Sequence, residues 1–80
     1  MRLDKYLKVS RIIKRRTTAR DFAANERVLV NGRVAKPSTP VDIGDVITVK
    51  LGERTNSYEV LELREHIKAT EAKNLYRIIE

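Results

Sequence analysis

Residues 2–20, RLDKYLKVSRIIKRRTTAR, combine a helical apolar pattern with eight of the 17 basic residues of the chain. Over residues 3–9 the apolar positions recur at the i, i+3, i+4 spacing of one helix face, which predicts a short helix. These positions are Leu3, Tyr6 and Leu7. The apolar phase breaks over residues 10–14, where we expect a turn. The stretch is therefore expected to form a basic surface that rests on a hydrophobic core.

A second helix is predicted to follow this turn. Thr17 and Thr18 are candidate N-cap residues, and Thr18 with Asp21 three positions later resembles a weak capping box. The inner face of this helix is predicted to hold Ala19, Phe22 and Ala23. Two helices of this length are not stable alone, so they need a sheet to pack against.

The sheet is predicted to begin with a hairpin over residues 28–35, VLVNGRVA. A type I′ turn requires positive φ at both central residues, and Asn31-Gly32 adopts it at little cost. Pro37 and Pro40 bracket a loop, and Ile43-Gly44-Asp45 indicates a turn into the next strand. That strand covers residues 46–51, with Ile47, Val49 and Leu51 expected to face the helices.

The C-terminal third is predicted to contain a polar turn over residues 52–56, a strand over 58–63 and a final helix over 70–79. The helix is expected from an i, i+3, i+4, i+7 pattern, with Thr70 as N-cap. The pattern is formed by Ala72, Leu75, Tyr76 and Ile79. We therefore expect an α+β fold, with two short N-terminal helices packed on a small, mostly antiparallel sheet and a short C-terminal helix.

The length and composition of the chain restrict its class. Eighty residues allow one small core, and we divide them into a domain over residues 1–63 and a C-terminal extension over 64–80. No apolar run approaches the roughly 20 residues that cross a bilayer, and the N-terminus lacks the pattern of a signal peptide. The chain has no cysteine, which excludes disulfides and thiolate metal sites. We expect a cytoplasmic monomer that does not bind membranes.

Positive charge is concentrated in the N-terminal part of the chain. Residues 1–36 hold eleven basic and three acidic residues, a net charge of +8, whereas residues 37–80 hold six basic and eight acidic residues, a net charge of −2. A one-sided basic field on a small domain with a pI near 10.0 is the usual footprint of a nucleic-acid binder.

The sequence shows no grouping of residues that would support catalysis. The single histidine, His66, has no cysteine or second histidine to act with, and we expect it to be structural or merely exposed. Asp42 and Asp45 are explained as turn formers. The three glycines are not spaced as a phosphate-binding loop. We therefore predict a protein that is not an enzyme and has no metal site or cofactor.

The basic residues of the first two helices are suited to phosphate binding. Arginine can hold a phosphate through a planar fork, and lysine supplies a point charge. The helices are too short for an evident recognition helix, and no Asn or Gln is placed for adenine readout. Few aromatic residues are free to stack on unpaired bases. These features favour structured RNA, recognised by its shape and backbone, over DNA.

Four motifs in order are similar to one known family. RLDKYL, KRRTTARDFA, RVLVNGRVAKPS and V-x-x-GDVI resemble the small RNA-binding domain named after small-subunit ribosomal protein S-four. The resemblance covers roughly residues 1–51 and implies two helices followed by a hairpin with V-N-G and a G-D turn. This family commonly has glycine between the second helix and the first strand, where this chain has Asn25-Glu26. Asparagine tolerates the left-handed conformation, so we expect the turn to be kept.

Within that family, the K-x-S-R-x-I-K-R-R-T run and the A-x-N-x-Y segment at residues 72–76 look most like the RqcP family of ribosome quality-control factors. This resemblance implies binding to a stalled large ribosomal subunit, at large-subunit rRNA and P-site tRNA. It also implies that the tRNA is stabilised while an RqcH-type factor adds an alanine tail to the stalled chain. The RNA-binding residues it implies are Arg2, Asp4 and Arg16, flanked by Lys5, Lys8, Arg11, Lys14, Arg15 and Arg20.

Three alternatives stay open at this point. A heat-shock-type ribosome recycling factor would share the domain and the target particle. A DNA-binding regulator would use the two helices as a helix-turn-helix and would require a twofold duplex site. An interaction module would carry its basic face only incidentally. For Asp4, a role in the helix dipole and a role in orienting an arginine are equally open.

Overall fold

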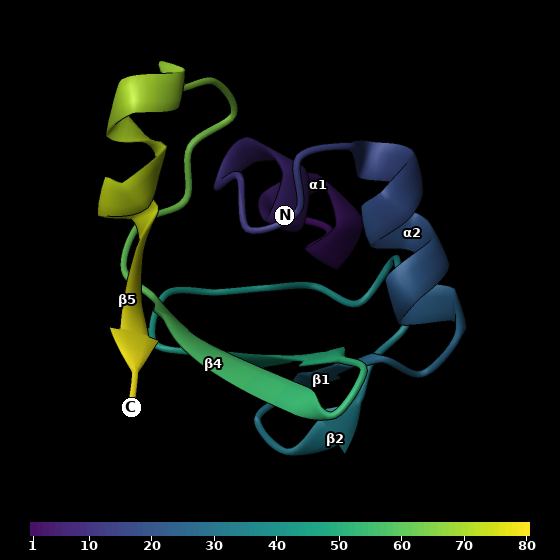
Figure 1. Ribbon diagram of the computed structural model, residues 1–80. Coiled ribbons are helices and arrows are strands. Elements are labelled where there is room, and N and C mark those ends of the chain that lie inside the picture. The colour runs from purple at the N-terminus through teal and green to yellow at the C-terminus, as the bar shows by residue number, and fades with distance from the viewer.

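The computed structural model describes residues 1–80, and Figure 1 shows the order of its elements. Two α-helices come first, five strands follow, and a short 3-10 helix precedes the last strand. The elements are α1 (Leu3–Val9), α2 (Arg16–Ala24), β1 (Val28–Val30), β2 (Arg33–Val34), β3 (Val46–Leu51), β4 (Arg54–Val60), η1 (Ala69–Leu75) and β5 (Tyr76–Ile79). The predicted α+β class is confirmed.

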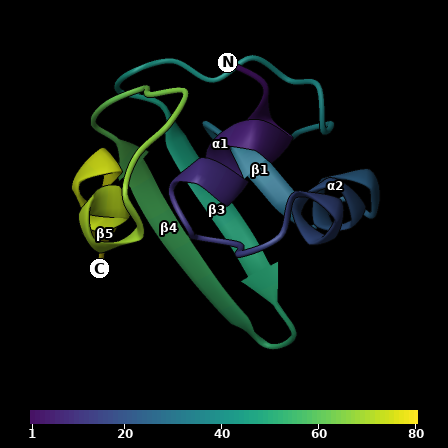
Figure 2. The same ribbon diagram turned by 90° about the horizontal axis from the view of Figure 1, so that it is seen from above.

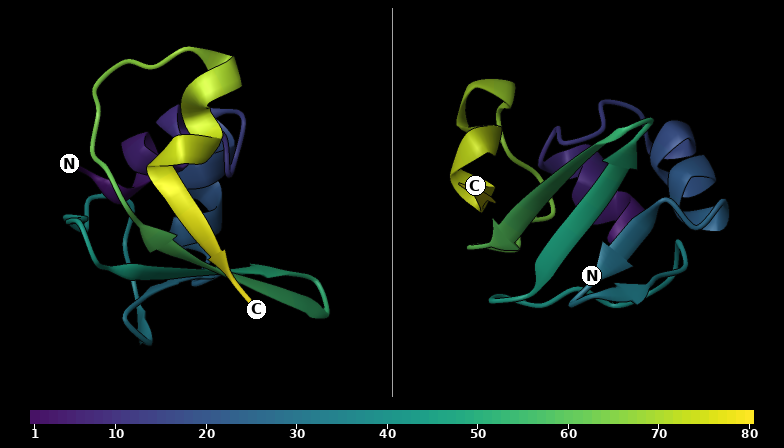
Figure 3. Two further views of the ribbon diagram at one scale, coloured as in Figure 1. Left: turned by 90° about the vertical axis from the view of Figure 1, so that its left-hand side faces the viewer. Right: turned by 60° about the horizontal axis from the view of Figure 1, so that its bottom comes forward.

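The five strands form one sheet in the order β2-β1-β3-β4-β5, and every neighbouring pair is antiparallel. Seen from above, α1 lies across the middle of the sheet, with α2 on one side and η1 on the other (Figure 2). Figure 3 shows that the opposite face of the sheet carries no helix. The fold is thus a two-layer arrangement whose helical layer contains the basic N-terminal stretch.

The β1–β2 hairpin confirms the predicted Asn-Gly turn. Asn31 has φ 52° and Gly32 has φ 81°, as a type I′ turn requires. The Asn31 side chain also joins this turn to the start of β3, because its Nδ2 donates to Asp45 Oδ1 at 3.1 Å and its Oδ1 accepts from the Val46 amide at 2.9 Å. The Asn31 side chain therefore links the β1–β2 turn to the predicted turn that precedes β3.

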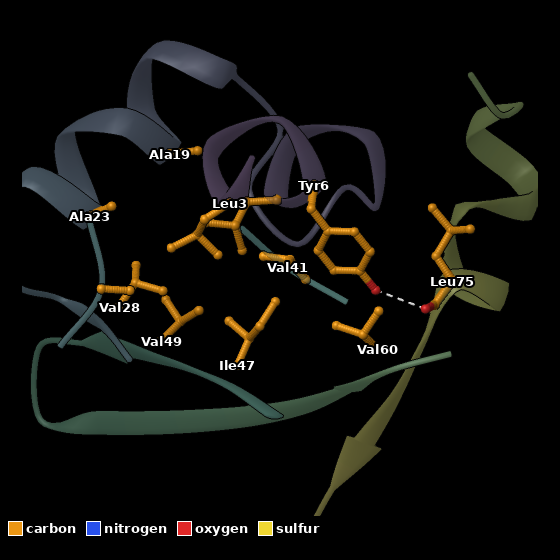
Figure 4. Close-up of a cluster of buried hydrophobic side chains, with 12 residues drawn as sticks. Leu3, Tyr6, Ala19, Ala23, Val28, Val41, Ile47, Val49, Val60 and Leu75 are labelled. Carbon is orange, nitrogen blue, oxygen red and sulfur yellow. Dashed lines mark hydrogen bonds between the residues drawn. The ribbon is translucent and has the colours of Figure 1, made fainter. Parts of the chain in front are cut away.

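The core lies between α1 and the sheet (Figure 4). The predicted inner face of α1 is fully buried, and small side chains on α2 let the two helices approach closely. The buried residues of these layers include Leu3, Tyr6, Leu7, Ala19, Ala23, Val28, Ile47, Val49 and Val60. The Tyr6 hydroxyl donates a 2.8 Å hydrogen bond to the Leu75 carbonyl, which joins α1 to the end of η1.

The predicted start of the second helix was wrong. Helix α2 begins at Arg16, its N-cap position is Arg15, and no side chain caps it. Thr17 and Thr18 lie exposed inside the first turn. The Ala19 amide donates to the Arg15 carbonyl at 3.0 Å, so the first turn of α2 closes without a capping side chain.

The predicted helix over residues 70–79 was also wrong in its second half. Residues Ala69–Leu75 form η1, whereas Tyr76–Ile79 form β5 along the edge of β4. Tyr76 pairs with Val60 and meets Tyr58 edge to face, with ring centroids 5.3 Å apart. Aromatic and β-branched side chains favour such a pairing when a strand edge is available. The division of the chain at residue 63 stays a prediction.

Three local expectations need correction. Leu51 is 41% exposed, because it lies at the end of β3 where the hairpin extends beyond the helices, so it does not face the core. Strand β4 begins at Arg54, inside the predicted turn, and ends before residues 61–63. The turn after α2 is kept, but Glu26 adopts the positive φ of 62°, whereas Asn25 has φ −98° and donates its Nδ2 to the Asp21 carbonyl.

Candidate nucleic-acid interface

The site is built around Asp4, a carboxylate with no solvent exposure in the first turn of α1. The Asp4 amide donates to the Pro37 carbonyl at 3.1 Å, and the Lys5 amide donates to Asp4 Oδ1 at 2.8 Å. The loop after β2 and the first turn of α1 therefore fix both the backbone and the side chain of Asp4.

Three arginines surround this carboxylate. Arg2 Nε lies 3.2 Å from Asp4 Oδ1, Arg16 Nη2 lies 3.4 Å from the same oxygen, and Arg20 Nε lies 3.9 Å from Oδ2. Arg2 precedes α1, whereas Arg16 and Arg20 are one turn apart on α2. We call these four residues the Asp4 cluster.

The arginines of the Asp4 cluster contact a buried carboxylate, but much of each side chain is exposed to solvent. Their side chains are 52%, 42% and 58% exposed for Arg2, Arg16 and Arg20, whereas Asp4 is 0% exposed. Each guanidinium has five N–H donors. Arg2 uses two of them and Arg16 uses one on the carboxylate, whereas Arg20, at 3.9 Å, forms an ion pair without a hydrogen bond. The cluster carries a net charge of +2 and keeps donors free for a planar, bidentate acceptor such as phosphate.

The electrostatics of Asp4 agree with this geometry. Burial alone would raise the pKa of its carboxyl, but the Arg2 hydrogen bond, the charge of Arg16 and the Lys5 amide together hold that pKa below its ordinary value. Asp4 thus stays ionised, and it orients three arginines in addition to occupying the first turn of the helix. Holding the arginines in place reduces the entropy that they lose when they bind a ligand.

The rest of the predicted residues divide into two groups. Lys5 is only 30% exposed, and its Nζ lies 2.8 Å from Glu65 Oε2, so it is already paired. The other four are exposed and form no ion pair: Lys8, Arg11, Lys14 and Arg15. The structure therefore brings together Arg2, Asp4, Arg16 and Arg20, and it leaves four further cations free along the turn between the helices.

Sequence reasoning missed the contribution of residues 65–67. These residues lie against the end of α1 and form a small pocket with Lys8, Val9 and Arg11. His66 is among the residues that line it, although the sequence placed His66 outside the site. A contact between segments almost sixty residues apart leaves no local signal in the sequence.

No group of three or more His, Asp or Glu side chains is arranged to hold a metal ion, and no helix combines the length and apolar character of a membrane span.

Comparisons with known proteins identify the relatives of this chain. A family model described as S4 domain matches residues 1–47, which include the whole Asp4 cluster. The RQC P-site tRNA stabilizing factor of Bacillus subtilis is 48% identical over 80 residues, which cover 100% of this chain and 93% of that protein.

Two further matches involve heat shock protein 15. The Heat shock protein 15 homolog of Aeromonas salmonicida is 36% identical over 69 residues, covering 86% of this chain and 52% of that protein. The trimeric structure of Vibrio cholerae Heat Shock Protein 15 superposes with a TM-score of 0.89 at 36% identity, covering 99% of this chain and 81% of that one. Because that structure is trimeric, the monomeric state of this chain stays a prediction.

Proposed function

This chain belongs to the S4-domain family of RQC P-site tRNA stabilizing factors, and from this membership we propose that it binds an obstructed large ribosomal subunit and stabilises its P-site peptidyl-tRNA. The protein is a non-enzymatic member of that family, so its action is binding and positioning. It works in the cytoplasm, where ribosomes translate, and it acts as a monomer.

The Asp4 cluster is the observation that carries this proposal. Three exposed guanidinium groups contact one buried carboxylate and together form an ordered binding site for phosphates. The free cations Lys8, Arg11, Lys14 and Arg15 extend the positive surface on the same two helices and their connecting turn. Lys5 keeps its ion pair with Glu65, and its role in RNA binding stays a prediction. We assign this surface to large-subunit rRNA and P-site tRNA.

The physical role of the protein is then to connect two RNA molecules. When one basic surface contacts both rRNA and tRNA phosphates, the tRNA contacts add binding free energy only when the tRNA is present, and they slow tRNA release accordingly. A retained tRNA gives an RqcH-type partner time to add alanines to the stalled chain. The RqcH-type factor is therefore a functional partner, without a direct contact being required.

Cosedimentation with purified large ribosomal subunits tests this function. Wild type is expected to bind subunits that carry P-site peptidyl-tRNA more tightly than empty subunits. Arg16→Glu should weaken binding to both by at least about tenfold, because it replaces a phosphate contact by a like charge. Arg54→Glu is the matched control, since Arg54 is exposed at the tip of the β3–β4 hairpin in the sheet layer. Equal binding by the two variants would support an interaction module with an incidental basic face.

Two other functions are not favoured by the comparisons. The match to the Aeromonas heat shock protein 15 homolog covers only about half of that protein, whereas the Bacillus subtilis P-site tRNA stabilizing factor matches over 93% of its length. Recovery of large subunits without P-site tRNA would favour the recycling role. If the protein were a DNA-binding regulator, duplex DNA would compete with ribosomal RNA for binding to it. We instead expect rRNA to displace all bound DNA.

A further inference from the structure

A second basic site lies at the opposite end of α1 from the Asp4 cluster. It is a pocket of about 90 Å³ between the end of this helix and the segment that precedes η1. Four polar and two apolar residues line it: Lys8, Val9, Arg11, Glu65, His66 and Ile67. One water needs roughly 10–15 Å³ on this measure, so the pocket has room for a small group such as one phosphate.

The local backbone explains why a pocket forms there. Helix α1 ends at Val9, and Arg11 then adopts a left-handed conformation with φ 64°, which turns the chain sharply. The Arg11 amide still donates to the Lys8 carbonyl at 3.1 Å, so Lys8 and Arg11 are held on the two sides of one tight turn. Both side chains are exposed and neither forms an ion pair.

The other wall is held in place by an ion pair. Lys5 Nζ contacts Glu65 Oε2 at 2.8 Å, and Ile67 packs against the hydrophobic core. These two contacts draw residues 65–67 against α1 and place His66 at the pocket. The wall is thus attached to the same helix that carries Lys8.

The charge of the pocket favours an anion. Glu65 is the single acidic residue in its lining, and the ion pair with Lys5 compensates its charge. The Lys5 hydrogen bond and charge hold the pKa of Glu65 below its ordinary value, so the pair stays intact. Lys8 and Arg11 then leave a net charge of +2, and the His66 ring adds a hydrogen-bond donor.

We propose that this pocket binds one phosphodiester group of the RNA backbone, with Lys8 and Arg11 as charge partners and His66 as a hydrogen-bond donor. The inference rests on the proposed function, because it places the same RNA along the whole of α1. The Asp4 cluster holds one point of the RNA, and the pocket holds another about one helical turn away, since Asp4 and Lys8 are four residues apart. Two separated contacts fix the direction of the RNA backbone across the helix.

Two substitutions test the pocket without entering the Asp4 cluster. Arg11→Gly removes the guanidinium and suits the positive φ at this position, so the turn is kept. His66→Ala removes an exposed side chain. Circular dichroism and thermal unfolding verify that each variant folds. The readout is cosedimentation with large ribosomal subunits carrying P-site peptidyl-tRNA, measured over a series of KCl concentrations.

For Arg11→Gly we expect affinity to fall by about three- to tenfold and the slope of log affinity against log salt to become less steep by about 0.7 to 0.9. His66→Ala should reduce the affinity and leave the slope nearly unchanged, because it removes a hydrogen-bond donor. Arg54→Gly is the matched control for the loss of one arginine, and it should bind like wild type. Wild-type binding by both pocket variants would overturn the proposal.

The source of the phosphate is tested with inorganic phosphate, added to wild type at constant ionic strength in place of chloride. One free ion lacks the second contact at the Asp4 cluster, so we expect subunit binding to be unchanged. Phosphate binding by the free protein, together with wild-type subunit binding by both pocket variants, would assign the pocket to the free ion and overturn the proposal.

The Arg16→Glu variant separates the two proposals. If Arg16→Glu loses binding while both pocket variants bind like wild type, the pocket proposal fails and the proposed function stands. If Arg16→Glu also binds like wild type, the proposed function fails together with the pocket.

Discussion

The Asp4 carboxylate of α1 lies 3.4 Å from the guanidinium of Arg16, the first residue of α2. Asp4 is fully buried and Arg16 is 42% exposed, so the contact joins the core to the solvent-facing surface. The same carboxylate holds Arg2 and Arg20. One buried negative charge therefore fixes the geometry of three positive ones, and several predictions about stability and RNA binding depend on it.

Asp4→Asn should weaken RNA binding although it raises the net charge of the protein by one. Without the carboxylate the three guanidinium groups lose their common partner, and their order must be restored on binding. Asparagine can still accept the Lys5 amide, so the expected loss of folding free energy is only about 1 kcal/mol. Cosedimentation with large subunits measures the affinity, and urea unfolding measures the stability.

Asp21→Asn is the matched control, because Asp21 is an exposed acid on α2 whose side chain forms no ion pair. It makes the same change in net charge and should leave binding equal or slightly tighter. If Asp4→Asn binds more tightly than Asp21→Asn, net charge governs binding and the ordering role of Asp4 is wrong.

The stability that Asp4 contributes should depend on pH in a defined direction. The pKa of Asp4 is lower in the folded protein than its ordinary value of 3.8. The unfolded chain therefore binds this proton first as the pH falls, and the contribution is present above pH 3.8 and lost as the pH falls through the lower folded value. The stability difference between wild type and Asp4→Asn, from urea unfolding, should be constant near neutral pH and shrink below about pH 4. A difference that grows on acidification would contradict this.

Tyr6→Phe should lower stability without changing RNA binding. Burial raises the pKa of the Tyr6 phenol, so the hydroxyl stays protonated and donates to the Leu75 carbonyl at 2.8 Å. That carbonyl also accepts from the Leu61 amide at 2.8 Å, so it keeps a partner in the variant. We expect a loss of about 0.5 to 1.5 kcal/mol in urea unfolding. Loss of subunit binding at a temperature where the variant is folded would contradict the assignment of Tyr6 to the core alone.

Glu26→Gly should stabilise the turn between α2 and β1. Glu26 has φ 62°, a conformation that costs a side-chain-bearing residue about 1 kcal/mol and that glycine adopts freely. The greater freedom of glycine in the unfolded chain offsets part of this gain, so the expected net increase is about 0.5 kcal/mol. Thermal unfolding measures it. Ala24→Gly, at the last residue of α2, is the control and should be destabilising.

The elements that the sequence predicted well are those with local causes. Helix α1 follows from the spacing of Leu3, Tyr6 and Leu7, and the hairpin follows from the conformational freedom of Asn31-Gly32. Both signals lie within a few residues of the structure that they specify, and tertiary packing does not oppose them.

The elements that were missed depend on partners far away in the chain. The i, i+3 spacing of Ala72 and Leu75 describes η1, but Tyr76 onward pairs with the free edge of β4, which no local pattern reveals. Similarly, the sequence left the role of Asp4 open, because the answer depends on how α2 packs beside α1. The contact of Lys5 with Glu65, and with it the pocket at His66, arises only when the fold brings the two ends of the chain together.

The salt dependence of binding tests the central claim most directly. Binding of the wild-type chain to large ribosomal subunits carrying P-site peptidyl-tRNA is measured over a series of KCl concentrations. If the basic surface neutralises about six phosphates, log affinity should fall linearly with log salt at a slope of roughly −4 to −5. A slope near zero would contradict binding of this protein through arginine and lysine contacts with RNA phosphates.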